Sequence, residues 1–239
     1  MPVFSNSTTI AYDELALAAY VRSVTPTLGF QQYDSTTLAD SSQKFTAGLR
    51  ENSVTIEGLF DETTGSGTLF ADLTGNAGSD TAKPTTIAPA GFSAGASAYL
   101  LPVKTVNLAL SSTVSDLVPF TLTLGAGGNG GFGTCLTGLA ALTASGNSTS
   151  QDDTASSSNG LLAHLHITAV SGTTPSMTVT IEHSTNNSTW ATLGSFSAAT
   201  AIGSQILNVS GTVNRYVRAA YTISGTTPSF TTLIAYERF

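Results

Sequence analysis

The chain has 239 residues, of which 41% are hydrophobic and only 10% are charged. Its formal charge of −7 comes from 15 acidic and 8 basic side chains, which argues against nucleic-acid binding, because affinity for phosphates comes from Lys and Arg. A single cysteine excludes an intrachain disulfide, and no stretch approaches the roughly 20 apolar residues of a membrane span. We therefore expect one large or two ordinary globular domains that bind neither DNA nor a membrane.

Ser, Thr, Asn and Gly carry most of the polarity. Thr suits solvent-facing strand positions, and Gly, Asn and Ser suit turns, so the composition favours many short strands. The scarcity of charge, and of Lys in particular, is typical of a surface that other subunits cover. A Thr-rich secreted β-protein that stays monomeric fits this composition equally well.

Alternating apolar and polar residues predict six strands in the first half of the chain: Thr8–Tyr12, Leu15–Val21, Leu28–Tyr33, Ser53–Phe60, Ala98–Leu110 and Leu117–Leu124. Residues 13–19 fit one or two helical turns equally well. Residues 34–51 lack sustained periodicity and are expected to be a long excursion. Thr68–Leu73 is the best helix candidate, closed by Gly75, and residues 76–96 are expected to be loop.

The clearest boundary is the glycine run of residues 125–131, which has almost no side chains to bury and is expected to be a flexible linker. We therefore predict one domain over residues 1–131 and a second over residues 132–239.

The second half predicts a β-sandwich, because strand-like segments recur at the spacing typical of that fold. These segments are Gly160–Val170, Met177–His183, Trp190–Phe196, Gln205–Val209, Tyr216–Ile223 and Phe230–Tyr236. Residues 146–160 are expected to form a long loop. The sequence Ser-Gly-Thr-Thr-Pro-Ser occurs at residues 171–176 and again at 224–229, which we interpret as one hairpin connection used twice.

Few residues point to chemistry. His164 and His166 share one strand face, and with His183 they would suffice for zinc, but surface imidazoles on a solvated sheet face are the simpler interpretation. Asp152 and Asp153 are better explained as a solvated pair than as calcium ligands. With no nucleophile elbow, phosphate loop or zinc-protease motif, we expect no enzyme, no catalytic residues, no cofactor and no metal.

Trp190 closes a polar hairpin formed by residues 184–190. An exposed Trp there would stack on a sugar ring and serve as a glycan contact. A lone Trp at the start of a strand is more often part of the core or a cap on a sheet edge.

Three segments of the first half carry a resemblance to a known family: residues 34–40, 45–49 and 53–61. They contain a Thr-Thr-x-x-Asp loop, a Gly-Leu pair and an alternating strand that ends in Gly-x-x-Asp. Over residues 8–125 the chain resembles the tail tube proteins of long-tailed bacteriophages. Residues 180–190 and 211–218 are similar to C-terminal β-domains attached to such proteins in phages of Gram-positive hosts.

The resemblance implies an all-β protein with one short helix, in which a tail-tube β-sandwich or barrel domain precedes an Ig-like or jelly-roll-like β-sandwich. It further implies hexameric rings that stack into the tube through which DNA is ejected. The excursion would be the arm that contacts the next ring, and its contact residues would be Thr36, Thr37, Asp40, Phe45, Gly48 and Leu49. The implied partners are other copies of the chain and the tape measure, tail terminator and distal tail proteins.

Charge is unevenly distributed, since residues 1–131 contain eleven acids and five bases whereas residues 132–239 contain four and three. In a tube, acids lining the lumen would repel passing DNA over about a Debye length, ~8 Å in physiological salt. Glu57, Asp61 and Glu62 are the candidates. Residues 1–5 lack the basic and apolar regions of a signal peptide, so we expect synthesis in the host bacterial cytoplasm and a final location in the virion.

Two other functions fit parts of this pattern. A capsid decoration or tail fibre protein would share the composition without needing a ring-stacking arm. A carbohydrate-binding module would depend on Trp190 and the second domain. These functions are compatible, because a tube subunit can display a glycan-binding domain on its exterior.

Overall fold

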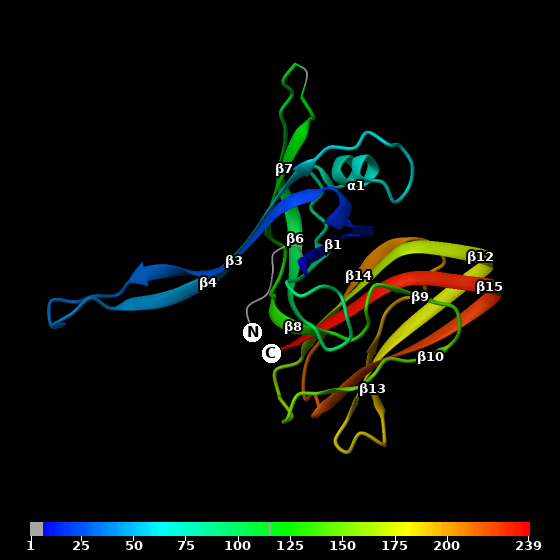
Figure 1. Ribbon diagram of the computed structural model, residues 1–239. Helices are drawn as coiled ribbons and strands as arrows, with labels where there is room; N and C mark the ends of the chain where they lie inside the picture. Colours follow the sequence, from blue (N-terminus) through cyan, green and yellow to red (C-terminus); the bar gives the residue numbers. More distant parts are fainter. Residues whose placement is uncertain (1–6, 115) are drawn as a thin grey trace.

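A computed structural model describes residues 7–114 and 116–239, and residues 1–5, on which the signal-peptide expectation depends, lie outside this range. The described residues are nearly all β, with one short α-helix among them, as the composition predicts. All strands belong to one hydrogen-bonded network that bends into two layered bodies (Figure 1).

The N-terminal body is a sheet in the order β3-β4-β7-β6-β5-β1-β2. Alternate residues of β4 and β7, such as Val54, Ile56 and Leu122, are completely buried in its core. Its strands are β1 (Thr9–Tyr12), β2 (Leu15–Ala16), β3 (Val21–Asp34), β4 (Phe45–Leu59), β5 (Lys83–Ala88), β6 (Ser97–Leu110) and β7 (Pro119–Ala126). A 3-10 turn, η2 (Leu17–Ala19), separates β2 from β3, so the segment expected as a strand over residues 15–21 is part strand and part helical turn.

Two expectations for this body are wrong. Residues 76–96 contain β5, which is buried on both faces and so shows no alternation that the sequence could reveal. The excursion over residues 34–51 is mostly regular, because β3 and β4 form one long hairpin and only residues 35–44 make its turn. The side chains of this hairpin are largely exposed, which removes the apolar pattern by which a strand is recognised.

The helix α1 (Leu69–Asn76) confirms the helix prediction. The hydroxyl of Thr68 caps its N-terminus by accepting a hydrogen bond from the amide of Ala71. Leu69 and Leu73 fasten it to the core of the N-terminal body. It runs past the expected stop at Gly75.

The glycine run is packed and hydrogen-bonded rather than a flexible linker. The chain leaves β7, makes a tight turn and continues as β8 (Gly131–Cys135), and both strands pair with the same side of β6. β8 also pairs with the last strand of the chain, so it joins the two bodies. Glycine is needed because any Cβ at Gly130 or Gly133 would clash with the backbone carbonyl of Leu100 or Tyr236, respectively. A domain boundary at residue 131 stays a prediction.

Replacing Gly133 with Ala should destabilise the protein by about 3 kcal/mol, because the new methyl group has rigid backbone in its way. Gly75→Ala is the matched control. Gly75 lies in α1 with open space around it, so Ala should stabilise the protein by up to about 1 kcal/mol. Urea unfolding followed by circular dichroism measures both, and equal effects of the two substitutions would contradict this account of β8.

The C-terminal body is built around two long, bent strands, β12 (Leu161–Ser184) and β15 (Tyr216–Arg238), which pair along their whole length. Figure 1 shows this two-stranded ribbon turning back on itself at the right edge of the molecule. Side chains from both halves of the ribbon, including Leu165, Val179 and Phe230, meet in one core. The smaller strands are β9 (Ala140–Leu142), β10 (Gly146–Asn147), β11 (Gln151–Asp152), β13 (Ala191–Ser195) and β14 (Gly203–Val209).

The repeated Ser-Gly-Thr-Thr-Pro-Ser segments are not two hairpins. They pair with each other, with Ser171 opposite Ser229 and Ser176 opposite Ser224, and form the bend in the ribbon. The pairing is close to twofold symmetric. A Cβ at Gly172 would lie 2.7 Å from the Thr227 carbonyl oxygen, and one at Gly225 would lie 2.9 Å from that of Thr174. Both glycines also have positive φ, a conformation that glycine adopts without strain. The repeat therefore supplies each strand with a residue that lacks a side chain, at the place where the two backbones approach closely.

Candidate assembly surface

The most prominent feature is the outer part of the β3–β4 hairpin, residues 29–51, which we call the arm. Figure 1 shows it leaving the body as an isolated two-stranded ribbon. Large apolar side chains on it are exposed: Phe30, Tyr33, Leu38, Phe45 and Leu49. Leu38 and Leu49 are 109% and 76% exposed, far more than a stably solitary protein needs to leave uncovered.

The residues expected to make the inter-ring contact all lie on the arm, but they have different roles. Asp40 accepts hydrogen bonds from the amide and hydroxyl of Thr37, at 2.8 and 3.0 Å, and pairs with Lys44, so it shapes the tip. The ion pair with Lys44, followed by the Thr37 bonds, lowers the pKa of Asp40. The hydroxyl of Thr36 accepts a bond from the Lys44 amide across the turn.

Three further expected residues lie on β4. Phe45 and Leu49 point into solvent, whereas Gly48 lies beneath the ring of Tyr33, where a Cβ would clash. Gly48 is therefore needed for the packing of the arm itself. The arm thus separates into a tip shaped by polar bonds and an exposed apolar surface.

A second exposed apolar projection lies at the end of the β6–β7 hairpin, which points upward in Figure 1. Its exposed side chains are Leu110, Val114 and Leu117. β3 also has a free edge, since within the described residues its backbone pairs with β4 alone. Unpaired edges and apolar projections invite pairing with another chain.

The face of the β3-β4-β7-β6 sheet opposite the core is polar. The register places Thr25, Thr55 and Thr123 in one row, and Ser23, Glu57 and Thr121 in the next. Glu57 is thus exposed on this hydroxyl-rich face. Asp61 and Glu62 lie beyond the end of β4, in a loop beside Asp116. The three candidate lumen acids therefore do not share one face.

The junction between the two bodies holds a buried polar chain that sequence reasoning missed. His164 and His166 project from β12 and are completely buried, so the interpretation as surface imidazoles is wrong. The ring of His166 donates through Nδ1 to the Asp13 carbonyl at 2.7 Å, so its Nε2 accepts from the Thr86 hydroxyl at 2.8 Å. Thr86 then accepts from Nδ1 of His164 at 3.2 Å. Burial lowers the pKa of both imidazoles, that of His166 to about 4.

The Asp13 carboxylate extends this network. It pairs with Lys83 at 2.6 Å and accepts hydrogen bonds from Ser204 at 2.6 Å and from Asn76. Burial raises the pKa of Asp13, but these donors outweigh it and hold the pKa below its ordinary value. Burial and the Asp13 charge raise the pKa of Asp72 to about 9, so Asp72 is neutral and bound to Asn76. The network fastens the N-terminal body to β12 and β14.

No metal site is evident in the parts of the chain that the structure covers. His183 does not join the other two imidazoles, because its Nδ1 accepts a bond from the Asn214 amide at 3.1 Å. Within residues 7–114 and 116–239 no cluster of three or more His, Cys, Asp or Glu side chains is suited to a metal ion. The same residues include no helix long and apolar enough to cross a membrane.

Trp190 is half-buried, and the Arg218 guanidinium lies 4.1 Å from the centre of its ring. Arg218 is itself paired with Glu182 at 2.8 Å. One face of the indole is therefore covered by a cation, which leaves less of it for stacking on a sugar.

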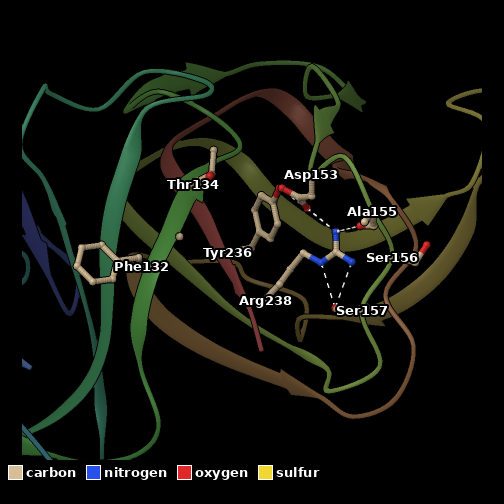
Figure 2. Close-up of a pocket in the computed structure, with 9 residues that line it drawn as sticks. Phe132, Thr134, Asp153, Ala155, Ser156, Ser157, Tyr236 and Arg238 are labelled. Atoms are coloured by element: carbon tan, nitrogen blue, oxygen red, sulfur yellow. Dashed lines mark hydrogen bonds and ion pairs between the residues drawn. The ribbon is translucent and has the colours of Figure 1, made fainter. Parts of the chain in front are cut away.

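A pocket of about 350 Å³ lies between β8 and residues 153–157 (Figure 2). Arg238 forms its wall and donates to Asp153, Ala155, Ser157 and the Val213 carbonyl, all within 3.3 Å. Tyr236 donates to Asp153, and burial raises its pKa strongly. Asp152 pairs with Arg215 at 2.6 Å but stays exposed to solvent, as expected, whereas Asp153 is partly buried beneath Arg238 and Tyr236. These bonds tie the 146–160 loop to β15 and leave the arginine without a spare donor for a ligand.

No protein-family model matches the chain, and no curated protein is similar to it. Solved structures with a partial likeness are components of phage tails or of similar particles. The tail of a gene transfer agent particle has a TM-score of 0.40 and 13% identity, covering 47% of this chain and 81% of that one. The tail tube of phage SPP1 has a TM-score of 0.44 and 8% identity, covering 55% and 78%.

The Dit protein of phage SPP1, described as a hub of the adsorption apparatus in phages that infect Gram-positive hosts, covers 97% of this chain. Its TM-score is 0.37, with 13% identity over 99% of its own length. At these scores and identities the likeness assigns no function to the chain.

Proposed function

We propose that the chain is a structural subunit of a phage tail, which assembles with copies of itself into stacked rings around a DNA channel. The observation that carries this proposal is the arm, a ribbon with exposed apolar side chains and no contact of its own with the core. Such a ribbon gains stability only against a partner. The free edge of β3 and the β6–β7 projection supply further surfaces for the same purpose.

In this proposal six copies form each ring and the arm reaches the neighbouring ring. The polar face of the β3-β4-β7-β6 sheet lines the channel, because Thr and Ser hydroxyls with Glu57 offer DNA no cationic cluster to bind. The C-terminal sandwich lies on the exterior, where it decorates the tail and aids attachment to the host surface. Tape measure, terminator and distal tail proteins complete the tail.

Negative-stain microscopy of the purified chain at increasing concentration tests the proposal. Stacked rings or tubes are expected. Single closed rings would indicate a subunit of the tail end rather than of the tube. Particles that stay solitary at every concentration would rule out self-assembly and favour a decoration protein.

Lysine on the polar face should slow DNA passage. Thr55→Lys and Thr123→Lys place cations in the row beside Glu57, and each would attract passing phosphates. Thr222→Lys, on the exterior of the C-terminal sandwich, is the matched control. DNA ejection from virions carrying Thr55→Lys and Thr123→Lys should be several-fold slower, and the delay should disappear at high salt. Equal ejection rates for the three variants would place this face outside the channel.

A further inference from the structure

A second pocket, of about 280 Å³, lies at the root of the arm and contains an incompletely bonded carboxylate. We call it the Glu237 pocket; its walls are Leu28, Phe30, Arg50, Asn52, Phe132 and Glu237. Glu237 is only 5% exposed, and its Oε2 has no hydrogen-bond partner. A buried carboxylate without a full set of donors is costly, so this site favours the arrival of a cation.

The cation that is already present, Arg50, acts on Glu237 only through its charge, beside a hydrogen bond from the Gly131 backbone. Arg50 donates to the Gly130 carbonyl at 3.2 Å and lies over the ring of Phe30, 5.5 Å from its centre. It makes no ion pair with Glu237 within 4.0 Å. Asn52 donates to the same carbonyl, so neither polar neighbour is directed at the carboxylate.

The mouth of the pocket is aromatic. Phe132 and Phe30 are 68% and 53% exposed. The ring of Phe132 packs against that of Tyr99, with ring centres 4.6 Å apart. Aromatic rings beside a buried carboxylate suit a long basic side chain, because the rings pack on its aliphatic stem and the carboxylate meets its charge. A large exposed aromatic anchor is also the usual centre of a protein interface.

Most basic side chains of the protein are already paired within the chain. Lys83, Lys104, Arg215, Arg218 and Arg238 each pair with an acid of the body to which they belong. Lys44 differs, because it lies at the tip of the arm with a 62% exposed side chain, between the exposed Leu38 and Phe45. Its partner Asp40 takes up only part of the hydrogen-bonding capacity of the Lys44 ammonium, which has three donors.

We propose that the Glu237 pocket receives the arm tip of a second copy of this chain, with Lys44 facing Glu237 and with Leu38 and Phe45 packed on Phe132. The arm cannot fill its own pocket, because β3 continues about 13 Å beyond Phe30 before the tip begins and runs away from the body (Figure 1). The contact joins different surfaces of two copies, so it repeats from copy to copy instead of closing as a twofold dimer. This inference rests on the proposed function and names the surface that the arm contacts.

Cysteine cross-linking tests the contact directly. Cys135 is completely buried, and burial raises its pKa to about 12, so it will not compete with introduced thiols. Leu38→Cys and Phe132→Cys subunits, prepared separately, are mixed under assembly conditions and treated with a short bis-maleimide. Cross-linked dimers are expected in the mixture and not with either variant alone. Leu38→Cys mixed with Ser188→Cys, on the exposed β12–β13 loop, is the control.

Charge exchange supplies a second test. Lys44→Glu should weaken association at least about thirtyfold, as expected for one lost partner of a buried charge pair. The double variant Lys44→Glu with Glu237→Lys should recover most of it, whereas Arg22→Glu should change little. Where Glu237→Lys fails to fold by circular dichroism, Glu237→Gln should weaken assembly and make it insensitive to Lys44→Glu.

The outcomes separate this inference from the proposed function. If rings or tubes form but the Leu38→Cys and Phe132→Cys mixture gives no more dimer than the control, the pocket is not the receptor although the assembly stands. If Arg22→Glu rather than Lys44→Glu weakens assembly, another cation fills the pocket and this inference is wrong. If the wild-type chain remains solitary, both this inference and the proposed function are wrong.

Discussion

Removing the arm is expected to abolish assembly while the body stays folded. Phe30 and Arg50 pair across the hairpin, so residues 31–49 can be replaced by Asn-Gly, which closes a two-residue hairpin. No side chain from residues 31–49 belongs to any of the three core clusters, so the free energy of unfolding should change by less than about 1 kcal/mol. Association should weaken at least about a hundredfold, because several exposed apolar anchors are lost together.

Sedimentation velocity measures the association and thermal unfolding measures the fold. The matched control replaces residues 185–189, the exposed loop between β12 and β13, by the same Asn-Gly turn. That variant should assemble like the wild type. Normal assembly of the armless protein would remove the main support for the proposed function.

Acidification should weaken the junction between the two bodies through the buried imidazoles. The pKa of His166 is lowered to about 4 in the folded protein, mainly by burial, against an ordinary value near 6.5. Below pH 6.5 the unfolded chain therefore binds a proton that the folded chain does not, and stability falls as the pH falls towards 4. The loss attributable to His166 is about 3 kcal/mol.

Other groups act in the opposite direction. Asp72 and Glu237 have folded pKa values raised to about 9 and about 7, mainly by burial, so acidification stabilises the fold through them. The measurement is therefore a difference between the wild type and His166→Gln. The variant should be less stable at pH 7, and its deficit should shrink by about 3 kcal/mol by pH 4, because it lacks the imidazole proton.

Chemical denaturation at a series of pH values gives this difference. His183→Gln is the control, since His183 is only partly buried and lies outside the junction. Partial burial, followed by the Arg238 charge, lowers the pKa of His183, so the deficit of His183→Gln should also shrink on acidification, but by less than that of His166→Gln. A deficit of His166→Gln that stays constant from pH 7 to pH 4 would show that His166 is not held neutral at the junction.

Much of the fold could be predicted from sequence patterns that act locally. The alternation of Val54 and Ile56 with polar neighbours indicates a strand with one buried face, and Thr68 before an apolar turn indicates a helix start. The low charge and high Ser and Thr content indicate an all-β protein. These features depend on each residue and its near neighbours along the chain.

The predictions that are wrong concern residues whose burial depends on segments distant in the sequence. β5 and the first half of β12 are covered on both faces, so His164 and His166 lie inside although polar residues in strands usually face water. One available signal was the apolar run Leu-Leu-Ala-His-Leu-His-Ile at residues 161–167, which leaves no polar face for the imidazoles. Glu237 and Phe132 carry no local signal, because the pocket they share joins β15, β8 and the root of the arm.

Hydrogen exchange of the arm amides tests most directly whether copies of the chain associate through the arm. Above the assembly concentration, amides of β3 and of residues 35–51 should exchange far more slowly than in dilute protein, while amides in the cores of both bodies exchange equally slowly in both. Unchanged exchange along the arm in assembled protein would contradict the account, because the exposed ribbon would then be no part of the contact.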